Sequence, residues 1–120
     1  MAIEILPTVR FKKIPLELIT VFEALLHVSI LYGETPVITG AAYEGYPVGN
    51  VHDRGYAVDV RTRNLSDPQR FAEAVERYLW AVSPHYVVLY GDPAHRDHIH
   101  IGYAWYFSYD SRKERQHGKC

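Results

Sequence analysis

The stretch Gly55-Tyr-Ala-Val-Asp-Val-Arg61 alternates between apolar side chains and small or charged ones over its whole length. Because successive side chains of a β-strand point to opposite faces of the sheet, this pattern predicts a strand with one face in the core. The expected core face carries Tyr56, Val58 and Val60. Asp59 and Arg61 share the opposite face, so Asp59 is expected to point away from the core.

Two helices are predicted from apolar side chains that recur at helical intervals. The first has Pro15 in its first turn, runs to about Tyr32 and ends at Gly33. Its expected buried side consists of Leu18, Val21, Phe22, Leu25 and Ile30. The second begins at Ser66-Asp-Pro68, where a capping residue precedes a proline, and continues to Pro84. Its expected buried side consists of Phe71, Ala74, Val75, Tyr78, Leu79 and Val82.

Three more strands are predicted from short β-prone runs at residues 36–39, 86–90 and 97–103. The last two are separated by a turn of ordinary length and are expected to form an antiparallel hairpin. This order of strands and helices is typical of a small α+β domain.

Length and charge limit the classes of protein that fit this chain. It has 120 residues, 48% of them hydrophobic, which predicts one domain over residues 1–109, followed by a polar, mostly basic tail over 110–120. A formal net charge of −1 gives no general attraction to nucleic acid or to an anionic membrane. Polar residues interrupt the first apolar run, which excludes a signal peptide and a membrane span there. We therefore expect a cytoplasmic protein as synthesised, with no membrane insertion.

Two short segments contain residue types that bind catalytic metals. In His52-Asp-Arg-Gly-Tyr-Ala-Val-Asp59, six residues separate the His from the final Asp, and Gly55 and Ala57 lie where bulk would crowd a bound ion. In His95-Arg-Asp-His-Ile-His100, the last two histidines alternate along the expected strand. Their imidazoles therefore leave the same face.

Zinc in hydrolases typically takes three protein ligands and keeps a fourth position for water. His52, Asp59 and either His98 or His100 meet this requirement. The single cysteine, Cys120, is the last residue, so the expected ligands are histidine and carboxylate only.

Asp97, His95 and His98 are the candidates for proton transfer. Strict strand alternation puts Asp97 on the face opposite His100, so Asp97 can act as a base only if the strand begins after it or the chain bends there. Imidazole titrates near neutrality, which makes the two histidines rival candidates. The histidines expected to be structural or solvated are His27, His85 and His117.

These motifs resemble those of the zinc peptidases that cut bacterial cell-wall peptides. This group includes D-alanyl-D-alanine carboxypeptidases and dipeptidases, the L-alanyl-D-glutamate endopeptidases of phage, and the penicillin-insensitive murein endopeptidases. Its pattern is Ser-x-His-x-x-Gly-x-Ala-x-Asp, followed later by Glu/Asp-x-x-His or His-x-His. Asn50-Val-His-Asp-Arg-Gly-Tyr-Ala-Val-Asp59 differs only at the leading serine, and Asp97-His-Ile-His100 satisfies both versions of the second half. The resemblance spans roughly Val37 to Tyr103.

The resemblance implies that His52, Asp59 and His100 bind zinc and that Asp97 is the general base. It implies a compact α+β fold in which a small antiparallel sheet carries the zinc site and packs against helices on its other side. The implied activity is hydrolysis of peptide bonds in peptidoglycan peptides. Without an export signal, such an enzyme reaches the wall when it is released or injected, as a phage lysis or tail-associated enzyme is. A cytoplasmic enzyme acting on recycled wall peptides also fits.

One departure from the family concerns substrate recognition. Relatives carry a Thr-Ser-Gly-Tyr-Arg-like segment whose arginine helps to bind substrate, whereas Ile38-Thr-Gly-Ala-Ala-Tyr-Glu44 has none. Tyr43 and Glu44 stand in its place, and an acidic Glu44 would repel a terminal carboxylate. This slightly favours an endopeptidase over a carboxypeptidase. The arginines that can replace the missing one are Arg54, Arg61 and Arg96.

Two alternatives stay open. The missing arginine also fits a catalytically inactive member of the same fold, acting as a binding or structural module. A metal-dependent hydrolase with another substrate is the second, because a fold and a zinc site do not determine what is cut. The sequence does not predict the oligomeric state.

Overall fold

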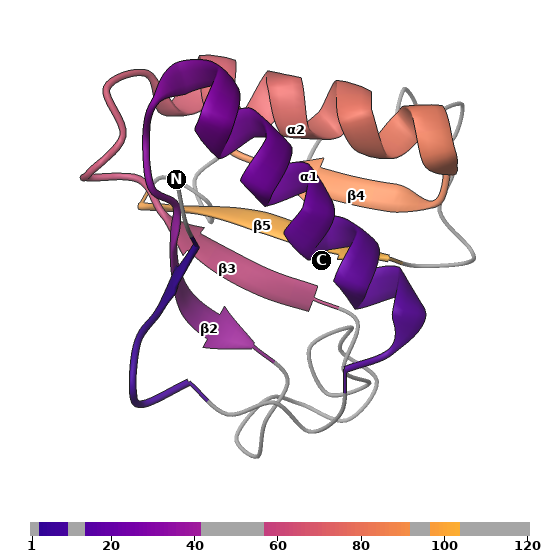
Figure 1. Cartoon of the computed structure of the whole chain (residues 1–120), viewed down its shortest axis with the longest axis horizontal. Coiled ribbons are helices and arrows are strands. Elements are labelled where there is room, and N and C mark those ends of the chain that lie inside the picture. Colours follow the sequence, from indigo (N-terminus) through magenta and orange to yellow (C-terminus); the bar gives the residue numbers. More distant parts are fainter. Residues whose placement is uncertain (1–2, 10–13, 42–56, 92–96, 104–120) are drawn as a thin grey trace.

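The computed structural model describes residues 3–9, 14–41, 57–91 and 97–103, which form one sheet and two helices (Figure 1). In chain order the elements are β1 (Glu4–Ile5), α1 (Leu16–Tyr32), β2 (Val37–Ala41), β3 (Ala57–Arg61), α2 (Pro68–Val82), β4 (Tyr86–Leu89) and β5 (His98–Tyr103). The expected α+β class is confirmed. The tail predicted over 110–120 lies outside the described residues.

The end of α1 and the start of α2 lie where the sequence predicts, whereas Pro15 caps α1 from outside its first turn and α2 ends at Val82, two residues before Pro84. Gly33, just after α1, has φ of 63°, a left-handed conformation that glycine adopts at little cost, and its amide donates to the carbonyl of Ser29. At the start of α2, the Asp67 carboxylate accepts a hydrogen bond of 3.1 Å from the amide of Arg70, and Pro68 follows as the first helical residue. Among the described residues, no helix is both long and apolar enough to cross a membrane.

The five strands are arranged in the order β1-β2-β3-β5-β4. The predicted pairing of the last two strands is confirmed, since β4 and β5 are antiparallel, with Tyr86 opposite Tyr103. The sheet as a whole is mixed and not purely antiparallel, because β1 pairs in parallel with β2. Strand β3 lies in the middle, between β2 and β5.

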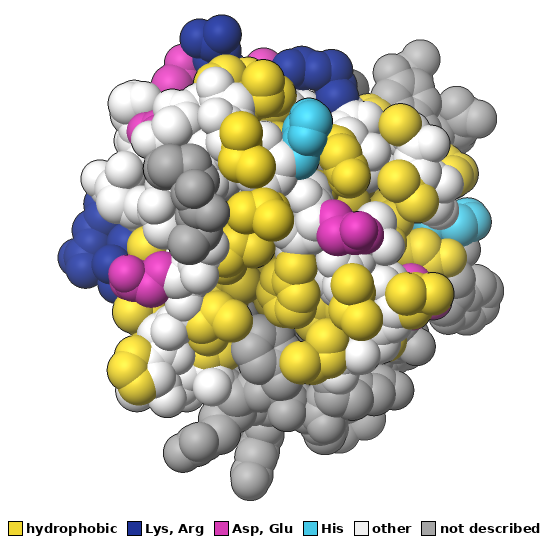
Figure 2. Space-filling model, viewed as in Figure 1, with side chains coloured by type: hydrophobic (Ala, Val, Ile, Leu, Met, Phe, Trp, Pro, Cys, Tyr) yellow, Lys and Arg dark blue, Asp and Glu magenta, His cyan; other side chains and the backbone are white. Residues whose placement is uncertain are grey.

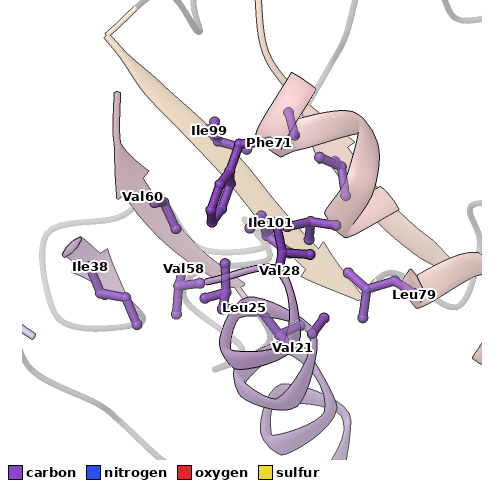
Figure 3. Packing of buried hydrophobic residues seen from close by; sticks show 14 of the residues in the cluster. Val21, Leu25, Val28, Ile38, Val58, Val60, Phe71, Leu79, Ile99 and Ile101 are labelled. Atoms are coloured by element: carbon purple, nitrogen blue, oxygen red, sulfur yellow. The ribbon is translucent and has the colours of Figure 1, made fainter. Parts of the chain in front are cut away.

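One face of the sheet packs against both helices, and Figure 3 shows the side chains that meet there. From the sheet come Ile38, Val58, Val60, Ile99 and Ile101, and from the helices come Val21, Leu25, Val28, Phe71 and Leu79. Side chains alternate along each strand, so burial of one face fixes the register. A slip of one residue would turn Asp59 into the core in place of Val58 or Val60, which is why this register is strongly preferred.

Two residues expected in the core are exposed, so these predictions are wrong. Ile30 is 63% exposed, because the buried side of α1 follows Leu18, Val21, Leu25 and Val28, and Ile30 is about 200° further round the helix than Val28. Val82, at 59%, has the correct spacing but is the last residue of α2. Figure 2 shows apolar side chains on the outer surface of the helix-covered side. The exposed apolar residues of α1 are Leu16, Ile19, Leu26, Ile30 and Leu31.

Candidate metal and substrate site

The face of the sheet that points away from the helices carries the polar residues singled out by the sequence. Asp59 of β3 lies directly opposite His100 of β5, and Arg61 lies opposite His98. Residues directly opposite each other in an antiparallel pair share a face, and so do residues two apart on one strand. All four side chains therefore leave the same face, as the alternation of both strands predicts.

Asp59 and His100 form the centre of this site. The distance from Asp59 Oδ1 to His100 Nδ1 is 3.3 Å, and His100 is only 2% exposed. This separation is longer than the roughly 2.7–2.9 Å of a charge-assisted hydrogen bond. Two atoms that each lie about 2.0–2.1 Å from a tetrahedral zinc ion are about 3.3–3.4 Å apart. The spacing of the two side chains is therefore compatible with two ligands of one ion, and a histidine with a carboxylate is a donor pair that zinc accepts.

Small or apolar residues flank this pair along its row across the sheet. Gly40 of β2 and Leu89 of β4 continue the row of residues that contains Asp59 and His100 across the sheet. In the neighbouring row, Ala57 is fully buried against Val87, with Leu89 packed on both. Apolar neighbours lower the local dielectric constant, which strengthens interactions between charges.

Asp97 lies one residue before β5, which begins at His98. The condition under which Asp97 can act on the site face, a strand that begins after it, is therefore met. Asp97 Oδ1 lies 2.8 Å from His98 Nδ1, and on the other side of the ring, His98 Nε2 lies 3.8 Å from Asp59 Oδ1. His98 thus stands between the two carboxylates.

The contact between Asp97 and His98 determines how the imidazole is oriented. The Asp97 side chain is 92% exposed, and its hydrogen bond with His98 holds the pKa of the carboxyl below its usual value. An ionised Asp97 can only accept, so His98 Nδ1 donates this hydrogen bond and the ring is held with Nε2 facing Asp59. Histidines in metal and catalytic sites commonly donate their second ring N–H to a carboxylate in this way.

A pocket of about 420 Å³ opens beside these residues. The acidic, basic and histidine residues that line it are Asp59, Asp97, His98, Arg61 and Arg63. The sequence pattern did not assign Arg61 to the site. It indicated Arg61 only as one of three arginines that could replace the substrate-binding arginine of the family. The position of Arg61 two residues after Asp59 was the available signal, because that spacing places both side chains on the same face.

Several predicted site residues lie outside the described part of the chain. They are the metal ligand His52, the acid–base candidate His95, and the substrate-binding candidates Tyr43, Glu44 and Arg54. Among the described residues there is no cluster of three or more His, Cys, Asp or Glu that could hold a metal ion.

Two histidines expected to have structural roles make contacts away from the site. His27 packs on Tyr78 with ring centroids 5.0 Å apart, and His85 packs against Tyr103 at 5.9 Å. The third such histidine, His117, lies outside the described residues.

Comparisons with known proteins add no relative to this picture. No family model matches the sequence, and no curated protein and no solved structure matches it significantly. The family relationship therefore remains a prediction from the two sequence motifs.

Proposed function

We propose that this protein is a zinc-dependent peptidase that hydrolyses peptide bonds in bacterial cell-wall peptides. One observation carries the proposal: Asp59 and His100 lie 3.3 Å apart on the face of the sheet away from the helices, a spacing compatible with two ligands of one zinc ion. The substrate class comes from the resemblance of the two motifs to cell-wall peptidases. A pocket beside the site leaves room for a peptide.

Zinc bound at such a site supplies Lewis acidity toward the scissile carbonyl and a water molecule. Asp59 and His100 would hold the ion, with His52 as the third predicted ligand. Because their strands pair directly, both side chains are held in position by the backbone of the sheet. Rigid strands position ligands more accurately than loops do.

Asp97 and His98 are proposed to move the proton. Asp97 orients His98 through the 2.8 Å hydrogen bond at Nδ1, which leaves Nε2 on the side facing Asp59. Either Asp97 accepts the proton directly, as the resemblance implies, or His98 Nε2 does so with Asp97 as its orienting partner. Both routes place the proton acceptor beside the pocket and the proposed ligands.

Internal bonds of the wall peptide are the proposed preference over removal of the terminal D-Ala. The segment that carries an arginine in the family has Tyr43 and Glu44 here, and a negative charge in that place would repel a terminal carboxylate. A phage lysis or tail-associated enzyme fits this preference, because such enzymes open the wall. An enzyme that processes recycled wall peptides is the alternative setting.

Incubating the full chain with purified peptidoglycan, with and without a chelator, tests the proposal. Mass spectrometry of the released fragments should show new peptide ends that disappear with chelator and return with zinc. Metal analysis should find about one zinc per chain. His100→Ala should lose the metal and the activity, whereas His27→Ala, a change at an exposed histidine away from the site, should keep both.

Two other results would contradict parts of this proposal. Sedimentation with the wall but no release of fragments would support a binding module. Full metal content in a folded His100→Ala variant would contradict the ligand assignment.

A further inference from the structure

Among the residues that the structure describes, Arg61 is the positively charged side chain nearest in register to Asp59 and His100. It is the last residue of β3, lies opposite His98, and shares its face with Asp59. It is half-buried and lines the pocket together with Asp59, Asp97 and His98. Arg63 lines the same pocket from just beyond the strand.

Arg61 is not used to neutralise the acidic residues around it. Among the described residues, Asp59 pairs with His98 and His100, and Asp97 pairs with His98. Within that part of the chain, Arg61 has no ion pair or hydrogen bond to either carboxylate. A half-buried guanidinium beside a pocket, with its five N–H donors not taken up by these acids, is suited to an anionic ligand.

The preferred partner of a guanidinium fork is a carboxylate or a phosphate, which it can bind through two parallel hydrogen bonds. Cell-wall peptides supply carboxylates. One is at the chain end, and others lie along the chain, where a glutamate is linked through its γ-carboxyl and keeps a free α-carboxylate. Both sources present the same chemical group to the pocket.

Strand geometry indicates where this carboxylate lies relative to the cleaved bond. Asp59 and Arg61 are two residues apart on one strand, a distance of about 6.6 Å along the sheet. An extended peptide advances about 3.3–3.6 Å per residue. A peptide lying along β3 would therefore have its scissile bond near Asp59 and a group one or two residues away near Arg61.

We propose that Arg61, assisted by Arg63, binds a substrate carboxylate one or two residues from the scissile bond and so selects wall peptides that carry a free carboxylate there. This inference rests on the proposed function, because it takes the scissile bond to lie at the Asp59–His100 pair. It assigns to Arg61 the role that the missing family arginine would have had, from a different strand of the sheet.

The test compares three synthetic wall peptides of one sequence. The first has all carboxylates free, the second is amidated at its C-terminus, and the third is amidated at the internal glutamyl α-carboxylate. For the wild-type protein, amidation at the recognised position should raise KM about 10- to 100-fold, which is the usual effect of losing a hydrogen-bonded charge pair. The amide that has this effect identifies the source of the carboxylate.

Arg61→Gln should raise KM for the free peptide by the same factor and change kcat little, because it removes binding and not chemistry. It should also make the free and amidated peptides equivalent. Arg61→Lys should fall between the two, because lysine keeps the charge and loses the fork. Arg77→Gln, at an exposed arginine of α2, is the matched control and should behave as wild type.

Binding of the same peptides, measured by titration calorimetry on zinc-loaded protein, separates this inference from the proposed function. Carboxylate-dependent binding that Arg61→Gln abolishes supports the inference even if no peptide is cut, in which case the peptidase proposal fails. Two results in an Arg61→Gln variant that keeps its zinc and its circular dichroism would overturn the role of Arg61. One is an equal loss of affinity for the free and the amidated peptides. The other is an unchanged preference for the free peptide.

Discussion

Adding zinc to metal-free protein should raise its melting temperature, because a ligand that binds only the folded state stabilises it by mass action. At a free zinc concentration 100 times the Kd, the gain is about 2.7 kcal/mol. A domain of 120 residues has an unfolding entropy of about 0.25 kcal/mol/K, so this gain corresponds to about 11 °C. Lower pH should reduce the shift, since histidine must lose its proton to bind the metal.

Asp59→Asn is the decisive variant for this measurement. The amide keeps the shape of the carboxylate and removes the charge that faces His100 at 3.3 Å. Differential scanning fluorimetry, with and without zinc, should show that the shift is largely lost in Asp59→Asn and retained in His27→Ala. An equal shift in Asp59→Asn would place the stabilising ion elsewhere and would refute the assignment of the site.

Three further outcomes are expected. Asp97→Asn keeps an oxygen that can accept from His98, so zinc should stay bound. If Asp97 is the base, steady-state kinetics should show that this variant has a kcat lower by about 10²–10⁴-fold. Wild-type turnover in the variant would refute that role. Burial raises the pKa of Tyr86, so the stability linked to its proton is present below about pH 10 and is lost as the pH rises through the folded-state pKa. Tyr86→Phe should lose about 1 kcal/mol with the hydrogen bond to a main-chain oxygen of α1, and urea unfolding should show a weaker loss of stability at alkaline pH than in wild type. Leu25→Ala, at a fully buried position, should cost about 2–5 kcal/mol in the same assay, whereas Ile30→Ala on the exposed side of α1 should change stability by about 0.5 kcal/mol or less.

Local signals in the sequence predicted the parts of this fold that depend on neighbouring residues. Gly33 and Asp67 act through their own backbone and side chain, so the helix ends could be placed without knowledge of the rest of the chain. The face of Asp59 followed from strand alternation, and so did the common face of His98 and His100.

Features that depend on distant pairing could not be predicted in this way. Strand β1 has two residues, both exposed, so no apolar pattern marks it, and it is defined only by its pairing with β2. The pocket beside Arg61 is formed where the end of β3 meets Leu6 and Thr39 from the first part of the chain. The hydrogen bond between Asp97 and His98 depends on where β5 begins, which the sequence left open.

The direct pairing of Asp59 with His100 has a consequence for how the protein acquires its metal. Directly opposed residues in an antiparallel ladder have their Cβ atoms about 4.5–5.5 Å apart, so the sheet sets the distance between these two proposed ligands before any ion arrives. Small zinc domains whose ligands come together only on metal binding unfold when the ion is removed. Here the hydrophobic core between the sheet and the helices is independent of the ion. The metal-free protein should therefore stay folded, exchange zinc without unfolding, and recover its full metal content when zinc is restored.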